Sequence, residues 1–429
     1  MAKKLKFGNG TWATKEGSTL AYNDENNNYK PLPFSFTRDS IATRVNKEGL
    51  IEVVGNDKPR IDYKDSAEGV LLLENSSTNL YTYSDDFSHS NWSKDYVSVN
   101  SSQIISPDGN LNTYEIKENT SNNEHSVRQL KSVTSGNYYT ISVFVKKSLN
   151  QRDIYIRCGD ANILVFFDTT NWEVGDEIQG FGKIENYGNG WYRLTATGLS
   201  DSTGSDNFRI GLSDGITNGS QNYTGNGTNS MYFYGAQLEQ SSYATSYIPT
   251  SGSSVQRAAE TCNGAGNSEV FNDSEGVLFA DISALANDGT NRMISLTNGV
   301  STASNLTLYF IPTANQIRYI YEVSSSQQCS IIANVNVLLS NKCSAVYKLN
   351  RFELWVNGFK IGEDTSGTVN PEGTFTKLSF LRGASQLPFY GKTKELGYYD
   401  TVLTDEELEY LTSYRSLNEL VTELNLNTL

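Results

Sequence analysis

Hydrophobic and polar residues alternate in short runs along most of the chain before residue 400. The run at residues 138–145 is rich in β-branched and aromatic side chains, which is typical of a strand. Similar runs occupy residues 153–157, 163–167, 191–197, 231–234, 306–311, 317–323 and 352–356. Turn residues separate the runs, and pairs such as Asn189-Gly190 favour the positive φ of tight hairpins. Many short strands at this spacing predict β-sandwiches rather than alternating strands and helices.

The pattern changes to a helical one near the C-terminus. Thr404-Asp405-Glu406-Glu407 fits a capping box, in which the Thr hydroxyl and the second Glu satisfy exposed backbone donors. Apolar residues then recur at steps of three or four, at Leu408, Leu411, Tyr414, Leu417, Leu420, Val421 and Leu424. We expect a break or bend near residues 413–416, with the first turn packed on its own domain. The remainder either packs on the core or contacts a partner chain through Leu417, Leu420 and Leu424.

Length and charge narrow the class of protein. The chain has 429 residues, enough for two to four compact units. Its 34 Lys and Arg against 48 Asp and Glu give a net charge of −14, which disfavours nucleic acid and anionic lipid as partners. No apolar run approaches the roughly 18 residues of a membrane span, and the N-terminus lacks the apolar segment of a secretory signal. We therefore expect folding in a cytoplasm and no membrane insertion.

The four cysteines are scattered at Cys158, Cys262, Cys329 and Cys343, with no Cys-x-x-Cys pair. This spacing does not fit a zinc site or a disulfide framework, so we predict four buried thiols.

Polar loops suggest where one domain ends and the next begins. Residues 24–28 form one such loop, and residues 250–254 and 263–267 bracket a connector. We predict an all-β chain of two β-sandwich domains, with an N-terminal β module and a short C-terminal helix. The expected segments are 1–75, 76–250, 251–267, 268–413 and 414–429.

Several stretches resemble known modules of bacteriophage virion proteins. Residues 36–63, with Phe36-Thr37-Arg38 and Pro59-Arg60, resemble a module common in those proteins, including the Leu-rich and Thr-Asn-Leu segments at 71–80. The start at residues 8–14, which contains Trp12, is similar to fibre proteins in phages of gut Bacteroides, including crAss-like phages. The resemblance implies a virion-attachment module over residues 1–75, with Trp12, Phe36 and Arg38 as anchor candidates.

Two further stretches resemble sandwich domains. Ser84-Asp85-Asp86-Phe87 with Trp92, and the later segments at 234–239, 247–250 and 257–259, resemble a carbohydrate-binding-module-like jelly roll for residues 76–250. Residues 353–358, 389–399 and 403–408 resemble a concanavalin A-like, laminin-G-type sandwich for residues 268–413.

Taken together, these resemblances imply a structural and adhesive virion protein, assembled in the bacterial cytoplasm and most consistent with a head fibre or spike. Its expected partners are capsid or fibre-base proteins, further copies of itself as a dimer or trimer, and bacterial surface polysaccharide. A tail fibre, a capsular-polysaccharide depolymerase and a scaffolding fibre with no ligand stay open as alternatives.

Tryptophans are the first candidates for glycan contact, because pyranose rings stack on aromatic faces. Trp191 and Trp355 lie in runs whose aromatic side chains we expect to face a core. Trp172 follows a Thr-Thr-Asn turn and is the best exposed candidate, with Trp92 as the second.

Catalytic and metal-binding patterns are weak. His89 and His125 are the only histidines; His125 lies in a polar stretch that we expect to be exposed, and His89 lies in a Ser-rich turn. Residues 268–400 contain no Glu-x-Asp-x-x-Glu run, the usual carboxylate spacing of concanavalin-type glucanases. Asp281, Asp288 and Asp364 fit solvated loop carboxylates better than a shared calcium site, and no EF-hand loop is present. We predict a protein that is not an enzyme, with no catalytic residue, no metal and no cofactor.

Overall fold

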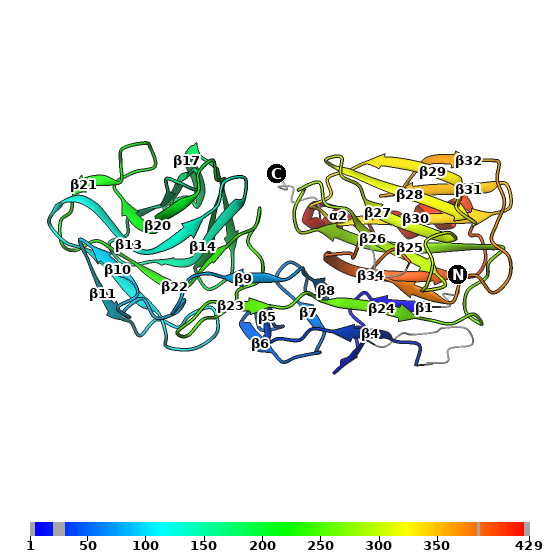
Figure 1. Cartoon of the computed structure of the whole chain (residues 1–429), viewed down its shortest axis with the longest axis horizontal. Coiled ribbons are helices and arrows are strands. Elements are labelled where there is room, and N and C mark those ends of the chain that lie inside the picture. The colour runs from blue at the N-terminus through cyan, green and yellow to red at the C-terminus, as the bar shows by residue number, and fades with distance from the viewer. Residues whose placement is uncertain (1–4, 20–30, 384–386, 424–429) are drawn as a thin grey trace. The chain divides into compact units, whose positions relative to one another are not determined.

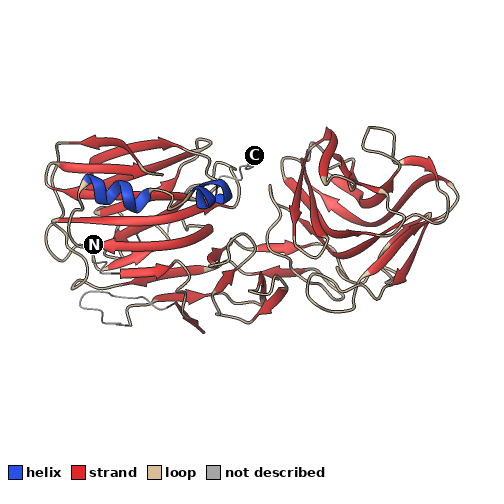
Figure 2. Cartoon of the chain, turned by 180° about the vertical axis from the view of Figure 1, so that it is seen from behind, coloured by secondary structure: helices blue, strands red, loops and turns tan. Residues whose placement is uncertain are grey.

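The structure is a computed structural model that describes residues 5–19, 31–383 and 387–423. The chain divides into two compact units, both discontinuous in sequence. Unit 1 contains residues 1–39, 55–75 and 259–429, and unit 2 contains residues 40–54 and 76–258. Strands dominate both units, which confirms the all-β prediction (Figures 1 and 2).

Two antiparallel sheets form unit 1 in the described part of the chain. The eight-stranded sheet runs in the order β32 (Phe359–Asp364), β31 (Arg351–Val356), β30 (Asn341–Lys348), β25 (Glu275–Ala284), β34 (Gly391–Tyr399), β8 (Val70–Leu73), β7 (Arg60–Asp62), with β1 (Leu5–Gly8) also paired to β34. The nine-stranded sheet runs in the order β2 (Thr14–Lys15), β3 (Ser18–Thr19), β4 (Phe34–Thr37), β24 (Thr261–Ala265), β33 (Lys377–Ser379), β26 (Arg292–Thr297), β27 (Asn305–Phe310), β28 (Gln316–Val323), β29 (Ser326–Asn334).

The core of unit 1 lies between these sheets. Leu306 and Leu308 of β27 belong to the same buried cluster as Leu278 and Ala280 of β25. Because side chains alternate along a strand, the residues between them point to the opposite faces of the two sheets. Unit 1 is therefore a β-sandwich with two outer faces.

Two helices lie on the outer face of the eight-stranded sheet (Figure 2): α1 (Asp405–Thr412) and α2 (Leu417–Glu423). Thr404 caps α1 in the predicted capping box with Glu407. Leu408 and Leu411 pack in a cluster with Phe279 and Trp355. The helical segment breaks between the two helices, so the predicted break and the packing of its first part are confirmed.

Unit 2 is a second antiparallel sandwich in the described residues. Its seven-stranded sheet contains β10 (Ser93–Asp95), β13 (Asn122–Val133), β20 (Gly204–Ser213), β15 (Asp153–Cys158), β16 (Ile163–Asp168), β17 (Glu173–Gln179), and β21 (Asn222–Thr224) paired to β13. Its six-stranded sheet contains β11 (Val97–Ser101), β12 (Tyr114–Glu118), β22 (Ser230–Glu239), β14 (Tyr138–Lys147), β19 (Trp191–Leu199), β18 (Phe181–Asn186). Two small ladders complete the unit, β5 (Ala42–Val45) with β6 (Ile51–Val54), and β9 (Ser77–Asn79) with β23 (Val255–Arg257).

Predicted turns form as the sequence indicates. Asn357 and Gly358 both have positive φ, 50° and 88°, and connect β31 to β32. Asn189 and Gly190, at 51° and 76°, lie between β18 and β19. Asn and Gly tolerate this left-handed backbone best, which is why these pairs mark the hairpins.

The first 75 residues are shared between the two units. β1, β7 and β8 extend the eight-stranded sheet, β2 to β4 extend the nine-stranded sheet, and the β5–β6 hairpin belongs to unit 2. β24, which follows residue 260, hydrogen-bonds to β4 and so joins the first and the last of the three segments that make up unit 1. The backbone groups of these strands find partners in the sandwich, as buried peptide groups must. An attachment role for residues 1–75 stays a prediction.

Candidate functional site

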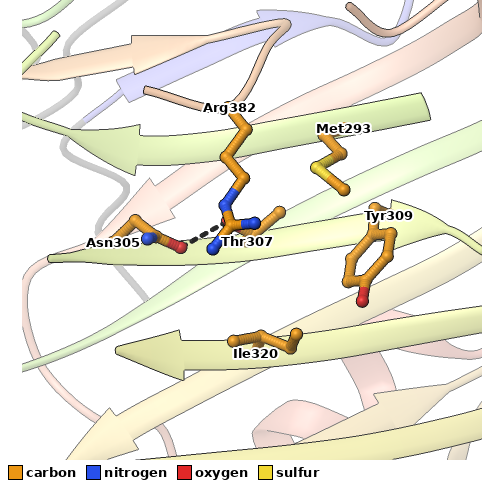
Figure 3. Close-up of a pocket in the computed structure, with 6 residues that line it drawn as sticks. All are labelled: Met293, Asn305, Thr307, Tyr309, Ile320 and Arg382. Atoms are coloured by element: carbon orange, nitrogen blue, oxygen red, sulfur yellow. Dashed lines mark hydrogen bonds between the residues drawn. The ribbon is translucent and has the colours of Figure 1, made fainter. Parts of the chain in front are cut away.

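The outer face of the nine-stranded sheet carries a small depression in unit 1 (Figure 3). Six residues line it: Met293, Asn305, Thr307, Tyr309, Ile320 and Arg382. They come from β26, β27, β28 and the segment after β33. On β27 the alternation with Leu306 and Leu308 places the three polar side chains on the outer side of the sheet, where they are nevertheless buried, with at most 6% of each residue exposed.

A hydrogen-bonded chain holds the polar side of this depression. Arg382 Nη2 donates to Glu322 Oε2 at 2.6 Å, and Asn305 Nδ2 donates to the same oxygen at 2.7 Å. Thr307 Oγ1 in turn donates to Asn305 Oδ1 at 2.6 Å. Among the described residues, Arg382 Nε and Nη1 have no hydrogen-bond partner. The guanidinium is thus positioned by Glu322 and keeps N–H groups to offer a ligand.

Tyr309 supplies an aromatic ring and a phenol beside the arginine. Burial raises the pKa of Tyr309, and Arg318 and Arg382 oppose that rise. The phenol is therefore neutral and can donate or accept a hydrogen bond. Met293 and Ile320 add apolar surface. With an empty volume of about 170 Å³, the depression is smaller than the roughly 300–1,000 Å³ of a small-ligand pocket, so it can contact only part of a ligand.

The two tryptophans predicted as glycan contacts differ in exposure. Trp92 is 1% exposed, packs against Tyr81 and Phe87, and donates from Nε1 to Tyr83 O at 2.9 Å. No face of its ring is open to a sugar, because the unit 2 core surrounds it. Trp172 is half-buried and stacks on Tyr192 with ring centroids 3.7 Å apart. Tyr192 occupies one face of the Trp172 ring, so a sugar could stack only on the part of the ring that Tyr192 leaves exposed.

The anchor candidates lie in unit 1. Trp12 is half-buried and donates from Nε1 to Gly69 O at 3.2 Å. Phe36 and Arg38 are buried, so their side chains are not on the surface.

Arg38 belongs to a buried ionic cluster with Arg60, Glu74 and Glu260. The Glu260 carboxylate accepts hydrogen bonds from Arg38 Nη1 at 2.7 Å and from Arg60 Nε at 2.8 Å. The Glu74 carboxylate lies 2.8 Å from Arg60 Nη2. Burial alone would lower the pKa of Arg60, but the carboxylates of Glu260 and Glu74 raise it above its ordinary value. Arg38 is therefore part of the internal framework of unit 1.

Of the residues predicted for oligomer contacts, Leu417 is 68% exposed on α2 and Leu420 is half-buried. Leu424 lies outside the described residues. No residue of α2 is fully buried, so the helix rests on its domain without an apolar core.

The prediction that His125 is exposed is wrong. It is fully buried on β13 because Tyr223 of β21 packs on its ring at 4.6 Å. His89 is half-buried and stacks on Tyr83. His89 and His125 lie in different surroundings. Among the described residues, neither histidine contacts a Ser or Cys side chain that could act as a nucleophile.

The three aspartates have separate partners. Asp281 is buried in β25 and accepts from Ser340, which corrects the expectation of a loop position. Asp288 pairs with Arg292, and Asp364 accepts from Ser366. The described residues contain no group of three His, Cys, Asp or Glu placed to hold a metal ion. All four cysteines are buried free thiols, as predicted.

Sequence reasoning did not single out Asn305, Thr307, Tyr309 or Arg382. A signal was present on β27, where polar residues alternate with Leu306, Leu308 and Phe310. Arg382 had no such signal, because its approach to β27 depends on the fold.

Comparison with known proteins gives no family. No family model matches the chain, and no curated protein matches it. Similar solved structures include the CBM40 of Ruminococcus gnavus IT-sialidase bound to α2,3-sialyllactose, with 18% identity over 35% of this chain and 94% of that chain, at a TM-score of 0.30. Domain 4 of AbnA, a GH43 extracellular arabinanase from Geobacillus stearothermophilus, in complex with arabinotriose, has 12% identity over 36% of this chain and 73% of that chain, also at 0.30. Likenesses this weak carry no argument about a ligand.

No helix in the described part of the chain has the length and apolar character needed to cross a membrane.

Proposed function

We propose that the chain is an adhesive structural protein of a phage virion that binds bacterial surface carbohydrate through the Arg382 depression. The observation that carries the binding proposal is the Arg382 guanidinium, which is 28% exposed above the buried Asn305, Thr307 and Tyr309 and has N–H groups to spare. Sugars present many hydroxyls on a partly apolar ring, and such ligands suit a few fixed donors and acceptors on apolar surface.

The virion assignment is supported by the sequence resemblance of residues 8–14 and 36–80. A head fibre or spike is the favoured location, with capsid or fibre-base proteins as partners and a homo-oligomer as the working form. Many copies on one particle would convert weak single-site binding into useful avidity.

We propose a binding role without catalysis. Glycoside hydrolysis ordinarily needs two carboxyl groups across the scissile bond. Glu322 is the carboxylate at the depression in the described residues, and it is engaged by Arg382 and Asn305.

A binding experiment tests the site. The full chain and the variant Arg382→Gln are titrated with capsular polysaccharide from the phage's host, and calorimetry measures the affinity of each. Loss of a charged donor predicts a roughly tenfold weaker affinity. Lys377→Gln is the matched control, because it removes an exposed cation from the same sheet. Equal affinity of all three proteins would refute the site.

The location is tested by cryo-electron microscopy of the particle that encodes the chain. We expect density on the capsid, with the copy number reduced by Trp12→Ala if residues 1–75 attach the protein. Absence from the particle would contradict the virion assignment and leave the binding test unaffected.

A further inference from the structure

Three arginines lie directly opposite one another on three neighbouring strands of unit 2. The register pairs Arg128 of β13 with Arg209 of β20, and Arg209 with Arg157 of β15. Neighbouring strands are about 4.8 Å apart, so this arginine row extends about 10 Å across the seven-stranded sheet.

The arginine row lies on the outer face of its sheet. Phe208 and Ile210, which flank Arg209 in sequence, are buried in the core of unit 2. The arginine side chains are 27% (Arg128), 25% (Arg209) and 41% (Arg157) exposed. The row is therefore accessible to a ligand from solvent.

Like charges directly opposite on a sheet destabilise it unless something compensates. Asp95 and Glu124 compensate in part: Asp95 pairs with Arg128 at 2.5 Å, and Glu124 pairs with Arg157 at 2.5 Å and with Arg209 at 3.0 Å. Three cations against two carboxylates leave one positive charge in excess. This excess stands out in a chain whose net charge is −14.

The compensation also leaves hydrogen-bond donors unused. The Arg128 guanidinium donates hydrogen bonds to Asp95 and Asn207. Arg157 and Arg209 each donate from Nη1 to Glu124, and their Nε and Nη2 atoms have no partner among the described residues. A planar guanidinium with a free pair of N–H groups matches the geometry of a carboxylate.

We propose that the arginine row binds a carboxylate-bearing polysaccharide, with Arg157 and Arg209 as its contacts. A single strand of uronic acid residues presents separate carboxylates that two neighbouring guanidiniums can meet. Nucleic acid fits less well, because its dense phosphates require many cationic contacts and the net charge of the chain repels them. This site lies in unit 2, and it does not depend on the Arg382 depression of unit 1.

The test uses the full chain and polygalacturonate oligomers as the probe, at low and at physiological salt. The same oligomers after carboxyl reduction provide an uncharged probe. We expect binding of the charged oligomer, no binding of the reduced one, and at least a tenfold loss in the double variant Arg157→Gln, Arg209→Gln. Lys183→Gln, which removes a 63% exposed cation from the same unit, should bind as the unchanged chain does.

A variant that is expected to raise the affinity, instead of lowering it, distinguishes a binding role of the arginine row from a purely structural one. Glu124→Gln removes the carboxylate that competes for both arginines, so it should strengthen binding severalfold. If the row only stabilises the sheet, Glu124→Gln would not strengthen binding, and that result would overturn the proposal. Thermal unfolding checks that each variant is folded.

Other outcomes also count against the arginine row. Equal binding of the reduced oligomer, tighter binding of a single-stranded DNA oligomer, or no binding of polygalacturonate at low salt would each overturn it. Loss of binding in Arg382→Gln but not in the double arginine variant would overturn it while supporting the depression in unit 1.

Discussion

The two outer faces of unit 1 belong to one sandwich and have opposite character. On the eight-stranded sheet, Val277, Phe279 and Trp355 make an apolar outer surface that Leu408 of α1 covers. On the nine-stranded sheet, the outward positions of β27 are polar, and they are buried although no helix of the described chain lies over them (Figures 1 and 2). The outward residues of a strand thus indicate whether a helix of the fold covers that face of the sheet.

Charges follow the same division. On the covered face, Lys342 pairs with Glu419 at 2.5 Å and Lys394 with Glu423 at 2.7 Å, so the cations of the sheet are used to hold α2. On the open face, Arg382 satisfies Glu322 and retains free N–H groups. Side chains that the fold has not used are the ones available for binding.

Removing an apolar contact of the covered face should have the largest effect. Leu408→Ala leaves a cavity under α1 and should lower the free energy of unfolding by about 3 kcal/mol. Leu417→Ala, at an exposed position on α2, should change it by less than about 0.5 kcal/mol. Urea unfolding of the full chain measures both, and similar values for the two variants would contradict the covered-face description.

A buried carboxyl under α2 should make stability depend on pH. Burial raises the pKa of Asp281 to about 6, against the opposing influence of Ser340, Lys342 and Lys394. Between about pH 4 and pH 6 the native state holds a proton that the unfolded chain has released, so the free energy of unfolding falls as pH rises through this window.

Asp281→Asn should abolish that contribution and stabilise the protein by about 2 kcal/mol at pH 8, with little difference at pH 4. Urea unfolding at the two pH values measures it. An equal difference at both pH values would mean that the proton on Asp281 is not the cause.

The ion pairs of α2 should contribute less. Glu419→Gln removes the partner of Lys342 and should cost about 1 kcal/mol or less. Hydrogen exchange in residues 417–423 should accelerate up to about fivefold, and added salt should produce the same change in the unaltered chain. Glu409→Gln on α1 is the control. If this variant also accelerated exchange in residues 417–423, the effect would be a general loss of stability and not the loss of the Lys342–Glu419 pair.

The smallest stability effect is expected on the open face. Arg382→Gln removes a half-buried ion pair and should change the free energy of unfolding by no more than about 1 kcal/mol, even where it weakens glycan binding. Thermal unfolding beside the binding titration separates the two effects. A large loss of stability would assign Arg382 to the framework instead.

Local patterns were sufficient for much of the fold. The strand runs at 138–145 and 317–323, the Asn357-Gly358 turn and the Thr404 capping box all depend on neighbouring residues, and all are confirmed. The Arg382 depression and the arginine row depend on which strands become neighbours. Arg128, Arg209 and Arg157 are far apart in sequence, and only the register brings them into line.

Burial was harder to predict than strand identity. His125 lies in a polar stretch, yet β21 covers it, and Arg38 carries a charge, yet Glu260 compensates it in the interior. In both cases a distant segment decides the environment of the residue.

The buried ionic cluster also fixes an order of events during synthesis. Glu260 lies 222 residues after Arg38 and 200 after Arg60. At about 5–20 residues per second, the two arginines wait on the order of tens of seconds on the ribosome for their carboxylate. All of residues 76–258 leave the ribosome in that interval. Unit 2 can therefore fold while the residues of unit 1 made so far are still unfolded and hydrated. Unit 1 therefore cannot complete its buried ionic cluster until the whole of unit 2 has been synthesised.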